Sequence, residues 1–116
     1  MSRALVVDDD RAVRKALQVN LTKHGIDVTL AETADEALGL LHGAPFDLLL
    51  TDYTMPRMTG LDLAQALRAI RPELPVILYS GYTDVIPEPQ LGRVAVELVQ
   101  KPIDPEALLA ALTKHL

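Results

Sequence analysis

Short apolar runs alternate along the chain with stretches in which apolar residues recur every three or four positions. The short runs are typical of β-strands, and the longer spacing is typical of amphipathic α-helices. The predicted strands are residues 4–7, 28–31, 46–51, 76–79 and 94–99. The predicted helices are residues 13–24, 33–41, 61–70 and 104–112, with one more between the fourth and fifth strands.

Regular alternation of strand and helix favours a parallel sheet covered by helices on both faces. The run at 46–51 is almost continuously apolar, as expected of a central strand. We therefore expect one α/β domain over residues 1–116, with a doubly wound five-stranded sheet in the flavodoxin-like order 2-1-3-4-5.

Several helix ends carry capping residues. Thr33 with Glu36 predicts a capping box, and Asp104 followed by Pro105 predicts another helix start. Gly25 follows the first helix at the position where glycine commonly ends a helix.

Overall composition excludes several classes of protein. No apolar run approaches the roughly 20 residues that span a bilayer, and the charged Arg3 near Met1 leaves no room for a signal peptide, so we expect a cytoplasmic protein without membrane insertion. The 11 basic and 16 acidic residues give a net charge of −5, which argues against direct binding of nucleic acid. The absence of cysteine excludes disulfides and thiolate metal sites.

Polar residues of chemical interest follow the predicted strands: Asp8 and Asp9 the first, Asp52 the third, Ser80 the fourth and Lys101 the fifth. In open α/β sheets ligands bind at this edge, so neighbouring first and third strands would bring the carboxylates together. Three crowded carboxylates repel one another, and an all-oxygen site suits Mg²⁺.

These groups match the needs of phosphoryl transfer to a carboxylate. Asp52 can act as the nucleophile, a metal ion and Lys101 can neutralise phosphoryl oxygens, and the Ser80 hydroxyl can hydrogen-bond to them. A single acid after a strand is usually a helix cap, and we assign Asp10 that role. Capping does not explain the remaining carboxylates together with a lysine.

The chain resembles response regulator receiver domains over its whole length. The resemblance rests on four motifs in order, namely LVVDDD at 5–10, TDYTMP at 51–56 with Gly60, SGY at 80–82 and KP at 101–102.

The resemblance implies roles for individual residues. Asp52 would be the phosphoacceptor. Asp9 and the backbone carbonyl of Thr54 would bind Mg²⁺ together with Asp52, and Asp8 would contribute through water or orientation. Ser80 would contact the phosphoryl group, and Lys101 would pair with it. The partner would be a sensor histidine kinase or a histidine phosphotransfer domain. Residues 79–82 resemble receivers attached to hybrid sensor histidine kinases, which implies phosphorylation by its own kinase in cis. A stand-alone receiver is the alternative.

Two features depart from the family pattern. Leu98 stands where receivers usually carry an aromatic residue on the fifth strand. Pro87 and Pro89 fall within the fourth helix, where proline costs about 3 kcal/mol, so we expect a short or distorted helix there.

Two other functions share parts of this pattern. A haloacid-dehalogenase-like phosphatase would use Asp8 and Asp10 as its Asp-x-Asp pair, but the chain lacks a cap domain and a second acidic pair after Lys101. A pseudo-receiver would not be phosphorylated, but every polar position of the site is present. We therefore expect a signalling domain that promotes its own phosphorylation and dephosphorylation, and not an enzyme.

Overall fold

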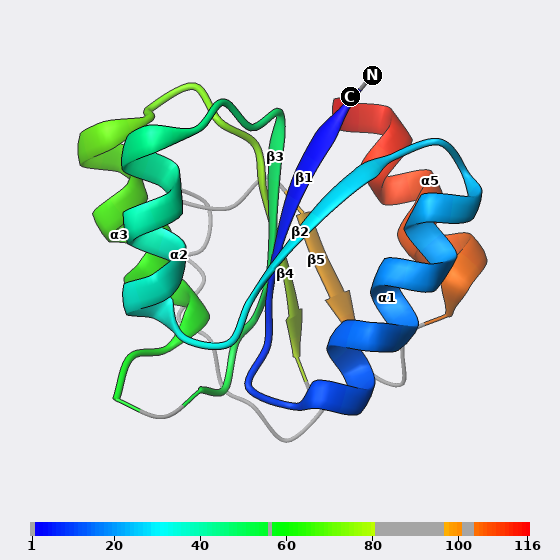
Figure 1. The fold of residues 1–116 in the computed structure, drawn as a ribbon, viewed down its shortest axis with the longest axis horizontal. Helices are drawn as coiled ribbons and strands as arrows, with labels where there is room; N and C mark the ends of the chain where they lie inside the picture. Colours follow the sequence, from blue (N-terminus) through cyan, green and yellow to red (C-terminus); the bar gives the residue numbers. More distant parts are fainter. Residues whose placement is uncertain (1, 56, 81–96, 101–103) are drawn as a thin grey trace.

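The computed structural model describes residues 2–55, 57–80, 97–100 and 104–116 (Figure 1). Strands and helices alternate in the order β1 Arg3–Val7, α1 Arg11–Lys23, β2 Asp27–Ala31, α2 Ala34–Gly43, β3 Leu48–Asp52, α3 Gly60–Ile70, β4 Val76–Ser80, β5 Glu97–Gln100 and α5 Pro105–His115. No helix in these ranges is both long and apolar enough to cross a bilayer.

The five strands form one parallel sheet in the order β2-β1-β3-β4-β5. This confirms the predicted fold and strand order. All five residues of β3 are buried, which confirms that this strand is central. Strands β1 and β3 are neighbours in the sheet, so their carboxyl ends lie side by side, with Val7 opposite Thr51.

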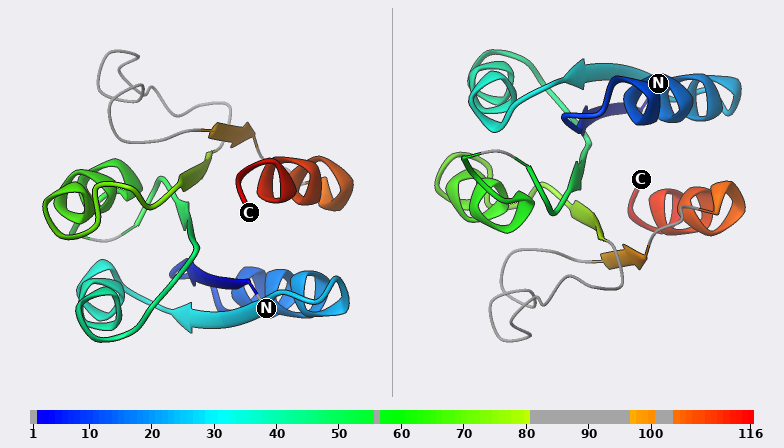
Figure 2. Two further views of the ribbon diagram at one scale, coloured as in Figure 1. Left: turned by 90° about the horizontal axis from the view of Figure 1, so that it is seen from above. Right: turned by 90° about the horizontal axis from the view of Figure 1, so that it is seen from below.

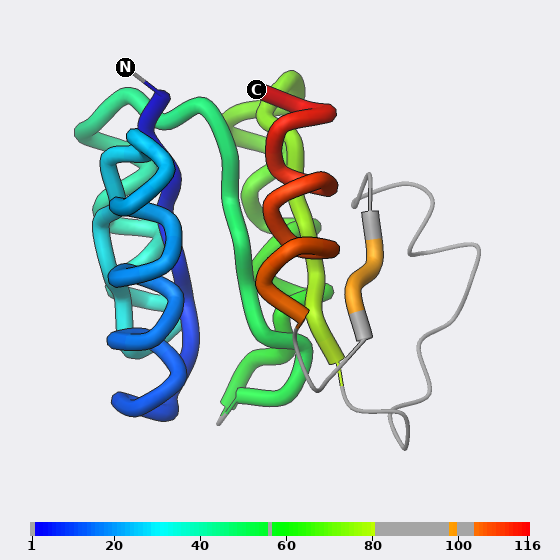
Figure 3. Tube along the Cα trace, turned by 90° about the vertical axis from the view of Figure 1, so that its right-hand side faces the viewer, coloured from blue at the N-terminus to red at the C-terminus, as the bar shows by residue number. Residues whose placement is uncertain are grey.

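Helices cover both faces of the sheet, α2 and α3 one face and α1 and α5 the other (Figure 2). Figure 3 shows α1 and α5 together on the second face. Alternate strand residues point to opposite faces and form two cores. The α2/α3 core includes Leu5, Val7, Leu49, Val76 and Leu78. The α1/α5 core includes Ala4, Val6, Leu48, Leu50, Ile77 and Tyr79.

Side chains cap the helices largely as predicted. The Asp10 carboxylate accepts hydrogen bonds from two amides in the first turn of α1, and Asp104 begins α5 with Pro105 next to it. The Thr33 hydroxyl accepts from the amide of Glu36. The complete capping box lies instead at Thr59 and Asp62, which the sequence analysis missed.

Gly25 follows the C-cap of α1 with a φ of +79°, in the left-handed region that favours glycine. The amide of Gly25 bonds to the carbonyl of Thr22, and the amide of Ile26 bonds to that of Leu21. This pair of bonds is a Schellman motif, so the predicted glycine ending is confirmed.

Some predicted bounds were wrong. The strand predicted at 46–51 begins at Leu48, because the Asp47 carboxylate bonds to the amide of Arg3 and the Phe46 side chain turns into the α2/α3 core. Helix α5 runs to His115, three residues beyond the predicted end. Pro87, Pro89 and the predicted fourth helix lie outside the described residues, as do residues 94–96 of the predicted fifth strand.

Candidate functional site

The structure brings three carboxylates together at the carboxyl edge of the sheet. Asp8 and Asp9 follow β1, and Asp52 is the last residue of β3. One carboxylate oxygen from each lies within 4.8 Å of the others. The adjacency of β1 and β3 produces this cluster, as the strand order predicts.

The three acids differ in exposure. Asp8 is 1% exposed and Asp52 is 3% exposed, whereas the Asp9 side chain faces solvent. Buried carboxylates this close together require a compensating positive charge. Oxygen donors without histidine or cysteine fit a hard divalent cation such as Mg²⁺. Asp8, Asp9 and Asp52 are therefore the described residues suited to hold one.

Hydrogen bonds hold the buried carboxylate of Asp8 on both sides. Its Oδ1 accepts from the amide of Asp10 at 2.8 Å, and its Oδ2 accepts from the hydroxyl of Tyr79 at 2.7 Å. Arg14 donates to the backbone carbonyl of Asp8 at 2.7 Å, which brings a cation near the cluster. The backbone and the side chain of Asp8 are thus fixed independently.

Tyr79 is the site residue that the sequence analysis missed. It lies on β4 opposite Asp52, and its side chain is fully buried in the α1/α5 core. Burial is the main cause that raises the pKa of Tyr79 above its ordinary value, followed by the hydrogen bond to Asp8 and the charges of the three carboxylates. The hydroxyl therefore stays protonated and acts as a donor. Its position within an apolar strand gave no sequence signal for this contact.

The loop after β3 is folded against the end of β4. The amide of Tyr53 donates to the carbonyl of Tyr79 at 2.9 Å, and the amide of Gly60 donates to the carbonyl of Tyr53 at 2.7 Å. The amide of Thr54 lies 3.4 Å from Oδ1 of Asp52 and donates to it. These bonds orient the Asp52 carboxylate and the Thr54 backbone.

Ser80 ends β4 at the same edge of the sheet and is 5% exposed. Lys101, the other predicted phosphoryl contact, lies outside the described residues. Leu98 on β5 pairs in register with Leu78, and its side chain is 45% exposed.

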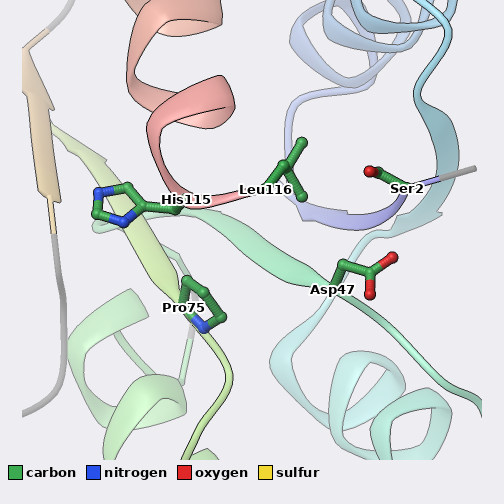
Figure 4. Close-up of a pocket in the computed structure, with 5 residues that line it drawn as sticks. All are labelled: Ser2, Asp47, Pro75, His115 and Leu116. Carbon is green, nitrogen blue, oxygen red and sulfur yellow. The ribbon is translucent and has the colours of Figure 1, made fainter.

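A separate hollow of about 460 Å³ lies at the opposite edge of the sheet, where the strands begin (Figure 4). It is lined by Ser2, Asp47, Pro75, His115 and Leu116. Asp47 already accepts a hydrogen bond from the backbone of Arg3. The hollow and the carboxylate cluster therefore lie at opposite ends of the strands.

The sequence profile of the response regulator receiver domain matches residues 4–113. The chain belongs to this family. Receiver domains are the phosphoacceptor modules of two-component signalling, so the predicted family and general function are confirmed. The phosphatase and pseudo-receiver alternatives are not favoured.

Known proteins resemble this receiver in sequence and in structure. The response regulator MprA of Mycolicibacterium vanbaalenii is 38% identical over 112 residues, which cover 95% of this chain and 48% of MprA. The response regulator PilR of Pseudomonas aeruginosa is 36% identical over 103 residues, covering 88% of this chain and 23% of PilR. The receiver thus spans half or less of the length of these relatives.

Solved structures agree with this assignment. Response regulator TrrA of Thermotoga maritima, in complex with Mg²⁺-BeF, is 30% identical with a TM-score of 0.92, and the match covers 100% of both chains. A receiver protein from Pseudomonas putida is 37% identical with a TM-score of 0.90, covering 97% of this chain and 96% of the other.

Proposed function

We propose that residues 1–116 form a receiver that accepts a phosphoryl group on Asp52 and requires Mg²⁺ for the reaction. The convergence of Asp8 and Asp9 on Asp52, at the end of the central strand, is the observation that carries the proposal. Asp8, Asp9, Asp52 and the backbone carbonyl of Thr54 are the proposed metal site. The Mg²⁺-BeF complex of TrrA, a protein with the same fold, supports this assignment.

In the proposed reaction a carboxylate oxygen of Asp52 attacks the phosphorus of a phosphohistidine. A P–O bond forms, the P–N bond breaks with its electron pair remaining on the imidazole nitrogen, and this nitrogen takes up a proton from water. Bound Mg²⁺ would offset the negative charge of the phosphoryl oxygens. The Thr54 amide orients Asp52, and the buried Ser80 at the end of the next strand is the proposed hydrogen-bond donor to a phosphoryl oxygen. Lys101 is the proposed second cation.

The phosphohistidine would belong to a sensor histidine kinase or a histidine phosphotransfer domain, or to the receiver's own kinase in cis. A net charge of −5 supports a protein partner over direct contact with nucleic acid. We propose a cytoplasmic signalling domain that is phosphorylated itself and does not turn over a separate substrate.

Incubation with acetyl phosphate and Mg²⁺, followed by intact mass measurement, tests the proposal. The wild-type chain should gain one phosphoryl group, and Asp52→Asn should gain none. Asp35→Asn is the matched control, because it makes the same change at an exposed acid in the first turn of α2. Full labelling of Asp52→Asn would contradict the assignment of the acceptor.

A further inference from the structure

We infer that Tyr79 is a positioning residue for the metal site, because its hydroxyl fixes the direction in which the Asp8 carboxylate faces the other two acids. This inference rests on the proposed function, since it assumes that the cluster binds a divalent cation. Tyr79 itself would not touch the cation.

Two hydrogen bonds at opposite oxygens restrain the rotation of the Asp8 carboxylate. The amide of Asp10 holds Oδ1 at 2.8 Å, and the hydroxyl of Tyr79 holds Oδ2 at 2.7 Å. Each carboxylate oxygen can accept more than one hydrogen bond, so both keep acceptor capacity toward a cation or its bound water. Without the hydroxyl of Tyr79, the amide of Asp10 alone would not fix the plane of the Asp8 carboxylate.

Burial makes the hydroxyl difficult to replace with water. Tyr79 is fully buried and Asp8 is 1% exposed. The Tyr79 ring belongs to the α1/α5 core, so close packing determines where the hydroxyl lies. A rigid core around a β4 residue thereby sets the geometry of a ligand that follows β1, on the far side of β3.

The Tyr79 hydroxyl is a polar group inside an apolar core. A buried hydroxyl is costly unless it is hydrogen-bonded, and phenylalanine would fill the same space without that cost. The short bond to Asp8 satisfies the hydroxyl and connects the core to the site. Residues that orient metal ligands in this way typically change metal affinity by about 10- to 100-fold when they are substituted.

Tyr79→Phe tests the inference, because it removes one oxygen atom and keeps the ring. The probe is Mn²⁺ alone, with free ion measured by electron paramagnetic resonance. The dissociation constant should rise by about 10-fold or more, while thermal unfolding in EDTA stays cooperative. Tyr53→Phe is the matched control, since it makes the same deletion at a ring packed against the α2/α3 core. It keeps the backbone amide and carbonyl through which Tyr53 contacts Tyr79 and Gly60, so its affinity should equal that of the wild type.

Phosphorylation by acetyl phosphate adds a second measure. In Tyr79→Phe the Mg²⁺ concentration for half-maximal rate should rise, while the rate at saturating Mg²⁺ stays close to that of the wild type. The effect should also disappear in an Asp8→Asn background, because Tyr79 acts through Asp8. A general loss of structure would lower the saturated rate and would persist in that background.

Wild-type Mn²⁺ affinity in a cooperatively folded Tyr79→Phe would overturn the inference, as would a wild-type chain that binds no Mn²⁺. A wild-type chain that binds Mn²⁺ but is not phosphorylated would refute the proposed function and leave the Tyr79 comparison valid. Should Tyr79→Phe fail to fold, the wild-type chain still decides the question. The Tyr79 hydroxyl proton should shift in the NMR spectrum as Mg²⁺ saturates, and no shift would overturn the inference.

Discussion

Gly60 lies so close to Asp52 that a side chain on the glycine would overlap the backbone carbonyl oxygen of the aspartate. The same Cβ atom would lie 2.8 Å from Cδ2 of Leu78 on β4. The first residue of α3 is therefore packed directly against the end of the strand that carries the proposed phosphoacceptor. Glycine is required here because a Cβ would have no room. Its φ is not in the left-handed region, so the backbone conformation itself does not call for glycine.

Gly60→Ala should lower the free energy of unfolding by about 1 to 3 kcal/mol, because the backbone at Asp52 must move to admit the methyl group. It should also slow phosphorylation. Gly39→Ala is the matched control, since no described residue outside its own helix lies within 4 Å of a Cβ placed there. This control should be stabilised by roughly 0.5 to 1 kcal/mol through helix propensity. Urea denaturation measures the unfolding free energy of both variants. An equal change in Gly60→Ala and Gly39→Ala would contradict the close packing at Gly60.

Asp9→Asn should stabilise the metal-free chain and remove most of the stabilisation by Mg²⁺. The substitution relieves repulsion among three carboxylates, worth about 1 kcal/mol for a solvent-exposed group. Wild-type protein should gain about 2.7 kcal/mol at 100 times the dissociation constant of Mg²⁺. Thermal melts in EDTA and in Mg²⁺ measure this, with Asp35→Asn as the control for net charge. A Mg²⁺ response in Asp9→Asn equal to that of the wild type would exclude Asp9 as a ligand.

Asp10→Ala should cost about 1 kcal/mol of stability, the usual value for loss of an N-cap. Affinity for Mg²⁺ should not change, because the amide of Asp10, which bonds to Asp8, is retained in alanine. Chemical denaturation and metal titration separate the two effects. A large loss of affinity would instead assign Asp10 to the metal site, as the phosphatase alternative requires.

Tyr79 should make the metal-free protein less stable at alkaline pH. Below about pH 10, the ordinary pKa of tyrosine, Tyr79 is neutral in both the folded and the unfolded chain. Above it the unfolded chain releases the proton, whereas burial raises the pKa of Tyr79 in the folded chain and keeps the proton bound. The difference in unfolding free energy between wild type and Tyr79→Phe should then fall by about 1.4 kcal/mol in total between pH 9 and pH 11.

Urea denaturation across this pH range measures the fall, and Tyr53→Phe serves as the control. Parallel pH dependence in wild type and Tyr79→Phe would show that Tyr79 ionises equally in both states.

The sheet could be predicted from the sequence because each strand is a short apolar run, and because apolar residues recur every three or four positions in the helices between them. The meeting of Asp8 with Asp52 followed from the strand order alone. The start of β3 could not be predicted, because Phe46 is as apolar as the strand that follows. Phe46 is kept out of the strand by a contact between Asp47 and Arg3, which lies 44 residues earlier in the chain.

The contact between Tyr79 and Asp8 could not be predicted from the sequence pattern. Its neighbours on β4 are apolar and buried, so an aromatic residue there indicates only a core position. The hydrogen bond to Asp8 joins residues 71 positions apart across two strand pairings. The residues around Tyr79 in the sequence do not indicate this contact.

The burial of Tyr79 also gives this protein an optical label for its own carboxylate cluster. The chain has no tryptophan and three tyrosines, so its near-ultraviolet absorption and circular dichroism come almost entirely from those phenol rings. A ring held immobile in the core contributes strongly to the dichroic signal, and its transition energy depends on the hydrogen bond that the phenol makes. Events at the carboxylates can therefore be followed in unlabelled protein, in real time, with an ordinary spectropolarimeter.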